Sequence, residues 1–367
     1  MPISGVENPA PFQRYCSPTL SIETRILGKL LDDHVRIEMI YAGICGTDLH
    51  FVETDPCTHY VKTSAPASIP SAGRVLGHEG VGRVISVGKA VSHIEKGAMV
   101  AFASIVCCMH CDACRRGDFN QCLRSSLLGM ERDGLFGTIV DVQASLVYDI
   151  SAMAQTDTDL KAVSCLEPAG VALLACEKAR VTSGDRVVVF GGGPIGIYCA
   201  MLCRLILGAA RVVLVEPMEK RRDLARNWCD AVYDVSSFLA SSEHPVDVLI
   251  EASGHLDNVT RSFKRVGPNG RVILLGRSGD ALRLDAVDHM ITQGISVSGS
   301  RGRLGGPFAK IMALYRAKRL PLASIVTMVA DSLNELPELL CDNQRIINNE
   351  CKVLVRIGSA SMVSDRS

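Results

Sequence analysis

The sequence has no excess of either charge, few aromatic residues and no long apolar run. Its 367 residues include 39 lysines and arginines against 39 aspartates and glutamates, and 5% are aromatic, with one tryptophan. A chain that binds nucleic acid through phosphate contacts usually carries a basic excess or a basic run. The nearest run, residues 220–222, is flanked by Glu219 and Asp223. We therefore expect a solvated helix face there and no nucleic-acid partner.

Two kinds of apolar segment are missing as well. The first ten residues contain Pro2, Glu7 and Pro9 and lack the apolar stretch of a signal peptide. The most lipophilic later stretch, residues 195–210, is interrupted by Arg204 and is too short to span a bilayer. We expect a cytoplasmic protein with no membrane partner. At roughly 100 to 200 residues per domain, the length predicts two domains.

Cysteine, by contrast, is abundant. The 15 cysteines are an odd number in a long chain, which argues against the fully paired disulfide framework of short secreted domains. In a reducing cytoplasm they are expected to be core residues or metal ligands. Cys199 and Cys203, on a predicted apolar helix, are expected in the core.

Apolar strands alternate with helices in the middle of the chain. Strands are predicted at residues 186–191, 211–216, 246–253 and 270–276, and helices at 194–207, 219–229 and 257–266. Continuously apolar strands separated by helices indicate a parallel sheet covered on both faces. Residues 159–302 are therefore predicted to form a doubly wound α/β domain.

The flanking regions have a different pattern. Residues 1–158 contain short strand-like segments punctuated by glycine and proline, at 34–40, 82–87 and 98–102, which indicates a β-rich domain. After Gly305 a helix at 308–318, a strand at 324–328 and a final helix and strand are predicted. Periodicity alone leaves open which domain this tail joins.

A glycine-rich turn follows the strand predicted at residues 186–191. It matches G-x-G-x-x-G and comprises Gly191, Gly193, Pro194, Ile195 and Gly196. Gly191 permits a tight turn, Gly193 lets backbone N–H groups approach a pyrophosphate, and Gly196 lets the helix pack close to the strand. The turn is predicted to bind a dinucleotide; a glycine turn without a ligand is the alternative.

An acidic residue supports this interpretation. Glu216 stands at the end of the next strand, where it would accept hydrogen bonds from ribose hydroxyls and repel a 2′-phosphate. NAD is therefore favoured over NADP. Arg221 and Arg222 weaken this preference, because an arginine beyond the acid can hold a phosphate.

Four cysteines lie close together in a polar segment. Their spacing suits one loop wrapped around a tetrahedral zinc, and they are Cys108, Cys111, Cys114 and Cys122. An iron–sulfur cluster is the chemical rival. Cys107 is adjacent to Cys108, but neighbouring side chains point different ways, so only one of the two is expected to be a ligand.

A second set of metal donors is dispersed among glycines. Three segments supply the donors, with Cys45 and His50 in the first, His78 and Glu79 in the second, and Cys165 and Glu167 in the third. One Cys, one His and one carboxylate from this set could hold a zinc with an open fourth position, as a Lewis-acid site requires. Each residue alone would more often be structural. The hypothesis of a zinc site depends on these residues occurring together with a dinucleotide site.

Taken in order, these motifs resemble the zinc-containing medium-chain dehydrogenase/reductase family. The likeness runs from about residue 37 to residue 357 and rests on a Gly-Ile-Cys-Gly-Thr-Asp segment, a Gly-His-Glu segment, the four cysteines and the glycine turn. It implies a GroES-like catalytic domain with a partly open β-barrel in residues 1–158 and a Rossmann domain in 159–302. Residues 303–367 would return to the catalytic domain, with the active site in the cleft between the domains.

The resemblance also implies roles for individual residues. Cys45, His78 and Glu167 would hold a catalytic zinc, and Glu79 would be a carboxylate able to approach it. Thr47 and His50 match the family's proton relay. The four-cysteine set would hold a structural zinc, so two zinc ions per chain are expected. Backbone near Gly276 and Ser300 would help to place the nicotinamide.

Two features bear on the branch of the family. The Glu167-Pro168 pair resembles the polyol, sugar and threonine dehydrogenases, with Cys165 as a competing ligand. The stretch of residues 53–72, which contains His59, is long for the family and lies where substrate loops usually occur. We expect NAD-dependent oxidation of the secondary alcohol of a polyol, sugar, aminocyclitol or β-hydroxy amino acid.

Two rival functions are compatible with parts of this pattern. A zinc-free enone or quinone reductase of the same superfamily would need neither Cys45 nor the four-cysteine set. A catalytically retired binding protein would be expected to have lost zinc ligands. The family implies a homodimer or homotetramer, for which the apolar segment 295–298 is a candidate edge.

Overall fold

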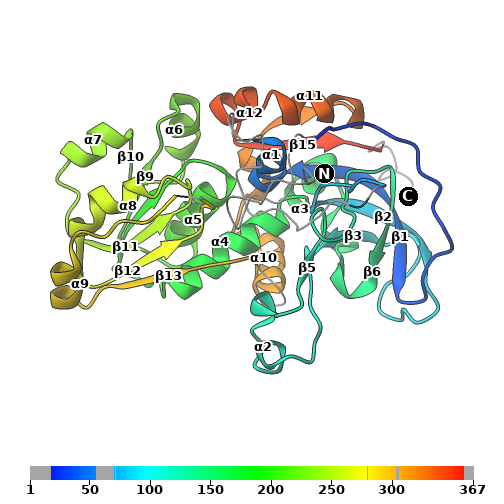
Figure 1. Ribbon diagram of the computed structural model, residues 1–367, viewed down its shortest axis with the longest axis horizontal. Helices are drawn as coiled ribbons and strands as arrows, with labels where there is room; N and C mark the ends of the chain where they lie inside the picture. Colours follow the sequence, from blue (N-terminus) through cyan, green and yellow to red (C-terminus); the bar gives the residue numbers. More distant parts are fainter. Residues whose placement is uncertain (1–17, 55–69, 71, 279, 303–305, 359–367) are drawn as a thin grey trace, which may run out of the picture.

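The chain folds into two sheets that lie side by side (Figure 1). The computed structural model describes residues 18–54, 70, 72–278, 280–302 and 306–358. Most of the 53–72 stretch, with His59, lies outside the described residues. One sheet is mostly antiparallel and the other is parallel, so the predicted α/β class is confirmed.

The first sheet is built around one long strand, β1 (His34–Ile44). Its burial alternates over the first residues and becomes continuous from Ile40, because the far end of β1 is covered by a second layer of core. Antiparallel neighbours pair with β1 directly or through β2, and they are β2 (Glu79–Val87), β3 (Met99–Phe102), β6 (Ile139–Gln143) and β7 (Val147–Asp149).

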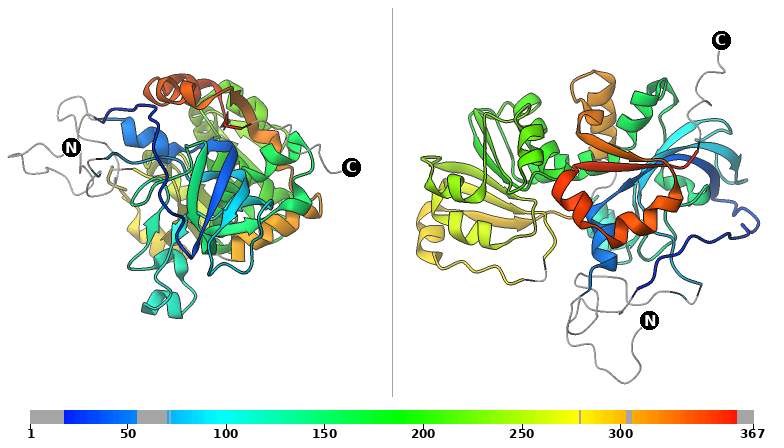
Figure 2. Two further views of the ribbon diagram at one scale, coloured as in Figure 1. Left: turned by 90° about the vertical axis from the view of Figure 1, so that its right-hand side faces the viewer. Right: turned by 90° about the horizontal axis from the view of Figure 1, so that it is seen from above.

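The end of the chain returns to this sheet. Strand β15 (Lys352–Arg356) pairs antiparallel with β1, with Ile44 opposite Val353, and β14 (Val326–Ala330) pairs parallel with β15. Figure 2 shows the C-terminal strands, in orange and red, beside the blue β1 in the view from above. The boundaries at residues 158 and 302 stay a prediction.

The second sheet is the parallel one predicted for the middle of the chain. Its six strands follow the order β10 (Ala231–Tyr233), β9 (Arg211–Val215), β8 (Arg186–Phe190), β11 (Val246–Glu251), β12 (Val266–Leu274) and β13 (Ser296–Gly299). The first strand in sequence lies centrally and the order reverses there, which is the Rossmann arrangement.

Helices cover both faces of the parallel sheet. On one face α4 (Leu166–Lys178) and α5 (Pro194–Leu205) pack against Val187 and Val189 of β8. On the other, α7 (Val235–Ala240) and α8 (Asp257–Ser262) pack against the alternate residues of the same strands. This two-sided cover explains why the strands are continuously apolar. Cys199 and Cys203 are fully buried in α5, as predicted.

The remaining elements are short. A two-stranded ribbon of β4 (Ile105–Val106) and β5 (Ser126–Leu127) carries the four-cysteine segment. The other helices are α1 (Gly46–Val52), α2 (Asp112–Arg115), α3 (Asp157–Val163), α6 (Glu219–Ala225), α9 (Val287–Gln293), α10 (Gly306–Arg316), α11 (Leu336–Cys341) and α12 (Gln344–Asn349).

Several predicted boundaries are wrong. The strand predicted from residue 270 begins at Val266, and the helix predicted to reach residue 266 ends at Ser262. The helix predicted to reach residue 229 ends at Ala225. The strand predicted from residue 324 begins at Val326, because the residues after Pro321 form a 3-10 turn over Leu322–Ile325. Strand β10 was not predicted; three residues are too few for a periodic signal.

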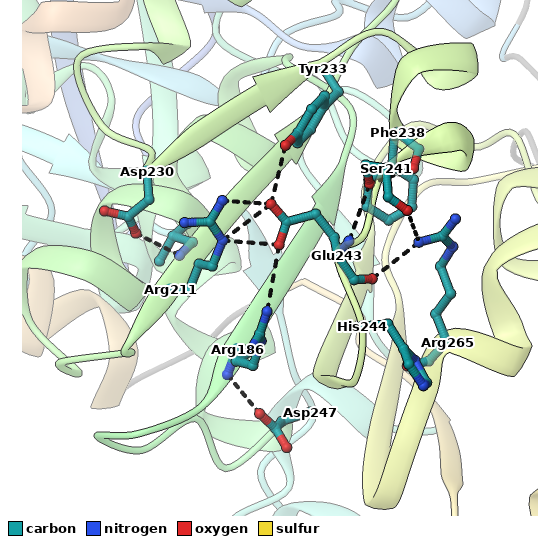
Figure 3. A network of polar contacts seen from close by, with 11 residues as sticks. Arg186, Arg211, Asp230, Tyr233, Phe238, Ser241, Glu243, His244, Asp247 and Arg265 are labelled. Carbon is teal, nitrogen blue, oxygen red and sulfur yellow. Dashed lines mark hydrogen bonds and ion pairs between the residues drawn. The ribbon is translucent and has the colours of Figure 1, made fainter.

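A buried carboxylate ties the amino ends of β8 and β9 to Tyr233, the last residue of β10 (Figure 3). Glu243, in the loop before β11, accepts hydrogen bonds from Nε of Arg211 at 2.9 Å and from the hydroxyl of Tyr233 at 3.2 Å. Arg186 of β8 forms an ion pair with it at 3.8 Å. The network lies at the edge of the sheet opposite the glycine turn, so its role is to hold the sheet.

Candidate active site

The site begins where β1 ends. Cys45 is the N-cap residue of α1, and its backbone N–H donates to Oδ2 of Asp48 at 2.9 Å. Oδ1 of Asp48 accepts from the backbone N–H of Gly77 at 3.2 Å. Burial raises the pKa of this fully enclosed carboxyl group. Asp48 therefore ties the Cys45 loop to the loop that carries His78.

A thiol, an imidazole and a carboxylate meet at this point. Ligand atoms of Cys45, His78 and Glu79 all lie within 4.8 Å of one another. His78 is 5% exposed, and its Nδ1 has no hydrogen-bond partner among the described residues. Buried polar atoms rarely lack a partner. This donor set, with its orphaned nitrogen, fits a metal ion such as zinc.

The electrostatics of the pocket favour a cation. Burial by itself would lower the pKa of His78, but the charge of Cys45 and the carboxyl groups of Asp48 and Glu167 raise it well above its usual value. The imidazole is thus surrounded by acidic groups. Such an arrangement is typical of sites that bind metal ions or do acid–base chemistry.

The two candidate carboxylates have different partners. The carboxylate of Glu79 accepts a hydrogen bond from the ammonium of Lys352. The same ammonium also donates to the carbonyl of Ile44 at 2.7 Å. Glu167, near the start of α4, accepts from the hydroxyl of Ser104 at 2.6 Å. As the side chains lie, Glu79 and not Glu167 joins the group of donors within 4.8 Å. Glu167 as a ligand therefore stays a prediction.

Cys165, the rival ligand, is directed elsewhere. Its thiol lies 3.5 Å from the carbonyl of Lys161, one turn back along the chain, and the side chain is fully buried. Burial raises the pKa of Cys165 to about 11. A thiol that resists deprotonation is a poor metal ligand.

The predicted proton relay lies on α1. Oγ1 of Thr47 is 3.7 Å from Sγ of Cys45, so its hydroxyl is beside the donor cluster. His50 is one turn further along, where residues three apart share a helix face. Its Nδ1 lies 3.3 Å from a carboxylate oxygen of Glu53, and its side chain is 40% exposed. Thr47 and His50 thus span the distance from the cluster to the surface.

The four-cysteine lobe extends from the body of the molecule around α2 (Figure 1). Four pairs of its sulfurs are 3.6 to 4.0 Å apart. A tetrahedral zinc with Zn–S bonds of about 2.3 Å places its sulfurs about 3.8 Å apart. The residues Cys108, Cys111, Cys114 and Cys122 form this group. The lobe therefore fits a closed metal site.

Backbone N–H groups prepare the lobe for thiolates. The N–H of Cys108 donates to the sulfur of Cys122 at 3.3 Å, and the N–H of Cys111 donates to the sulfur of Cys108 at 3.4 Å. Similar contacts lower the pKa of Cys111 to about 6. Cys107 does not belong to the group, since its thiol points to Sδ of Met109 at 3.3 Å.

The glycine turn has the shape that a pyrophosphate requires. Gly191 has φ +103°, and a Cβ on Gly196 would lie 1.9 Å from the carbonyl oxygen of Gly191. By contrast, a Cβ placed on Gly193 would meet no atom of the described residues within 4 Å, its own chain neighbours aside. Gly196 is thus needed for the fold itself. The space at Gly193 is open, as expected where a ligand approaches the backbone.

The residues around Glu216 are organised by hydrogen bonds. Its carboxylate accepts from the N–H groups of Gly192 at 2.6 Å and Met218 at 2.8 Å. Arg221 donates to the carbonyls of Glu350 and Ile346, at the end of the chain. The guanidinium of Arg222 donates to the carbonyls of Glu216 and Pro217.

The two other predicted cofactor residues are neighbours at the carboxyl edge of the parallel sheet. The N–H of Gly276 donates to the carbonyl of Glu251 at 2.9 Å, and the N–H of Ser300 donates to the carbonyl of Leu274 at 2.9 Å. A Cβ on Gly276 would lie 2.1 Å from the backbone N of Gly254. At this edge of the sheet the backbone at Gly276 is therefore in direct contact with the backbone at Gly254.

Comparison with known proteins decides the family. Residues 31–152 match the model of the alcohol dehydrogenase GroES-like domain, and residues 194–316 match that of the zinc-binding dehydrogenases. The chain belongs to the zinc-containing medium-chain dehydrogenase/reductase family. This confirms the resemblance and the GroES-like and Rossmann folds, and it makes the protein an oxidoreductase.

Individual relatives of this dehydrogenase are distant but span most of its length. It is 28% identical to an L-threonine 3-dehydrogenase of Caldanaerobacter subterraneus over 80% of the chain and 83% of the relative. It is also 28% identical to a probable D-xylulose reductase A of Arthroderma otae, over 84% and 87%. A solved structure assigned as a zinc-binding dehydrogenase of Sinorhizobium meliloti, bound to NADP, shares 25% identity and a TM-score of 0.78, covering 90% and 93%.

Two site residues of the dehydrogenase escape sequence reasoning. Lys352 follows a cysteine at the start of an apolar strand, and that isolated charge is the only signal. Arg277 directly follows Gly276, but nothing in the sequence indicates where its side chain lies.

Across the parts of the chain that the structure describes, no helix is long and apolar enough to cross a membrane.

Proposed function

We propose that this dehydrogenase reversibly oxidises the secondary alcohol of a polar substrate, with zinc at the Cys45 cluster and NAD as hydride acceptor. One connection carries the proposal. The thiol of Cys351 contacts the carbonyl of Gly192 at 3.8 Å, and the next residue, Lys352, contacts Glu79. The dinucleotide turn and the donor cluster are therefore joined through two consecutive residues. Hydride transfer requires such proximity between cofactor and alcohol.

The chain supplies the metal ligands and the route for the proton. Cys45, His78 and Glu167 would hold the zinc, and Lys352 would keep Glu79 as a neighbouring carboxylate. A zinc held there would supply a Lewis acid for the substrate oxygen, and bound NAD would accept the hydride. The hydroxyl of Thr47 would take the proton of the alcohol and pass it to His50, which hands it to solvent.

The preference for NAD follows from the groups around Glu216. Its carboxylate is held in place by two N–H donors and would repel a 2′-phosphate. Arg221 and Arg222 are both engaged with backbone carbonyls, so neither is placed to compensate that phosphate. NADP in the Sinorhizobium meliloti structure makes the choice a necessary control.

Second copies of this chain are the proposed protein partners. Strand β13 is the last strand of the parallel sheet on one side, and an edge strand offers unpaired N–H and carbonyl groups. Val287 and Ile291 of the nearby α9 are exposed. We propose a homodimer or homotetramer formed through this edge, which sedimentation of the wild type and of a Val297→Pro variant would test.

The function is tested by a screen for NAD reduction over polyols, sugars, amino alcohols and simple alcohols. Activity with polar secondary alcohols is expected, together with about two zinc ions per chain. Cys45→Ala and His78→Ala should abolish turnover while binding of NADH is retained. Full turnover in either variant would overturn the site, and activity confined to simple primary alcohols would overturn the substrate class.

The choice of third ligand needs its own comparison. Glu167→Gln should lower the zinc content after dialysis from about two to about one per chain, whereas Glu79→Gln should retain both. The opposite result would make Glu79 the ligand.

A further inference from the structure

Two arginines meet at the carboxyl edge of the parallel sheet. Strands β12 and β13 run parallel with Leu274 opposite Gly299, and the chain leaves them side by side. Arg277 lies just beyond β12 and Arg301 just beyond β13, and both side chains are exposed. In a Rossmann fold ligands bind at this carboxyl edge, so the arginines lie on the ligand-binding side of the sheet.

The backbone under the first arginine is fixed. Gly276, directly before Arg277, is anchored by its N–H to Glu251 and has no room for a side chain. A Cβ on Gly254 would lie 2.7 Å from the carbonyl oxygen of Arg277. The side chain of Arg277 therefore starts from a rigid platform, as a residue that determines specificity must.

The second arginine joins the two domains. The carbonyl of Arg301 accepts from the side chain of Asn120 at 3.0 Å, and its guanidinium lies 3.4 Å from the hydroxyl of Ser125. Both partners belong to the region of the four-cysteine lobe. Arg301 thus lies where the parallel-sheet domain contacts the lobe.

The charges around Arg277 identify what it faces. Arg277 is accessible to solvent but has protein on several sides, and this partial burial, together with the positive charge of Arg301, lowers its pKa, while Cys45 and Glu131 act in the opposite direction. The guanidinium therefore lies within electrostatic reach of the thiol of the donor cluster. Glu131 is itself bonded to the N–H of Leu127 at 2.8 Å.

We propose that Arg277 and Arg301 bind an anionic group of the substrate, so that the preferred substrate is a polar alcohol with a carboxylate or a phosphate. This inference rests on the proposed function and specifies its substrate. Two guanidinium groups that repel each other gain most from a ligand carrying negative charge. Arginine also matches the geometry of carboxylate and phosphate oxygens with paired N–H donors.

The pair is distinct from the adenosine end of the dinucleotide site. Glu216, which would take the ribose, follows β9, and β9 is separated from β12 by β8 and β11. The charge of Arg277 instead interacts with that of Cys45, beside which the reacting alcohol would be held. An effect of Arg277 on the KM of the substrate and not on that of NAD is therefore expected.

The test uses matched substrates on the zinc-loaded enzyme. Sorbitol is compared with gluconate and with sorbitol 6-phosphate, and xylitol with xylitol 5-phosphate, which separates carboxylate from phosphate. At least one anionic member should exceed its neutral partner in kcat/KM by about tenfold or more. Arg277→Ala should reduce that ratio to about one through KM, and Arg277→Lys should retain part of it. Arg261→Ala, at an exposed position of α8, should leave the ratio unchanged.

Failure of this inference and failure of the proposed function give different results. Equal kcat/KM for neutral and anionic partners, or an unchanged ratio in Arg277→Ala, would overturn the inference while leaving the dehydrogenase function in place. If no alcohol reduces NAD, the proposed function fails, and calorimetric titration with gluconate and sorbitol 6-phosphate decides the inference. Binding of either anion about tenfold tighter than sorbitol, lost in Arg277→Ala, supports it; equal binding overturns it.

Discussion

The ammonium of Lys352 donates to the carboxylate of Glu79 where both side chains are 1% exposed. The two residues are far apart in the chain and meet because β15 lies beside β1 and β2 begins at Glu79. Breaking a buried ion pair leaves an uncompensated charge. Lys352→Met should therefore lower the free energy of unfolding by about 3–5 kcal/mol.

Denaturant unfolding checks this expectation. Lys89→Met, at an exposed position, should change stability by less than about 0.5 kcal/mol. Adding Glu79→Gln to Lys352→Met should restore part of the loss, because the unpaired charge is then removed. A Lys352→Met variant as stable as the wild type would show that the pair contributes nothing net.

The Glu243 network should make stability depend on pH. The hydrogen bonds from Arg211 lower the pKa of Glu243 below its ordinary value of 4.5, so the folded state binds its proton less readily than the unfolded state. The stabilisation is fully present above pH 4.5 and is lost as the pH falls through the lower, folded value. Glu243→Gln should cost about 1.5–3 kcal/mol at pH 7.

The difference between Glu243→Gln and the wild type should shrink as the pH is lowered below 4.5. Urea unfolding at a series of pH values measures it. A difference that stays constant down to acid pH would mean that the charge of Glu243 is not what stabilises the sheet edge.

Two cysteines that lie four residues apart should behave differently in the lobe. Cys111→Ser should remove one zinc per chain, because Cys111 is one of the four sulfurs that lie together. Cys107→Ser should retain both zinc ions, since the thiol of Cys107 points to Met109. Metal analysis of dialysed protein distinguishes them, and equal zinc loss in both variants would contradict the assignment.

Alanine substitutions at two glycines of the turn should have different effects, one on cofactor binding and the other on stability. Gly193→Ala should fold with nearly unchanged stability but bind NADH weakly, because the added methyl group meets no atom of the described residues within 4 Å, its own chain neighbours aside, and would occupy the approach of the pyrophosphate. Gly196→Ala should destabilise the fold itself, since its Cβ would lie 1.9 Å from a carbonyl oxygen. Thermal unfolding and NADH fluorescence titration separate the two, and tight NADH binding by Gly193→Ala would move the cofactor elsewhere.

The charge of Glu216 should set the choice of cofactor. Glu216→Gln keeps an acceptor for the N–H of Gly192 but removes the repulsion of a 2′-phosphate. The ratio of kcat/KM for NAD over NADP should fall about tenfold, equivalent to about 1.4 kcal/mol. Glu219→Gln, on the first turn of α6, is the matched control. An unchanged ratio in Glu216→Gln would place the determinant at another residue.

The sequence predicts the parts of this fold in which a local pattern and the final environment agree. Strands such as β8 are apolar at every position because helices cover both faces of their sheet. The four cysteines lie within one lobe, so their spacing already contains most of the geometry of the site. The glycine turn is likewise a contiguous segment.

The remaining parts depend on contacts between distant segments. The sequence does not show that Asp48 bonds to the loops of both Cys45 and Gly77, nor that Lys352 reaches Glu79. Which carboxylate lies nearest the thiol follows from the packing of α4 against the first sheet. The same is true of Arg277, whose position follows from the pairing of β12 with β13.

The return of β15 to β1 has a consequence for how the protein is made. Ile44 leaves the ribosome long before its partner Val353, and at 5–20 residues per second the delay is about 15 to 60 s. During that interval the strands of the parallel sheet, which are continuous in sequence, can already assemble. One edge of β1 stays unpaired until β15 is made, and during this time the Glu79 carboxylate lacks its ammonium partner Lys352. The buried ion pair beside the donor cluster therefore forms only after β15 has been synthesised.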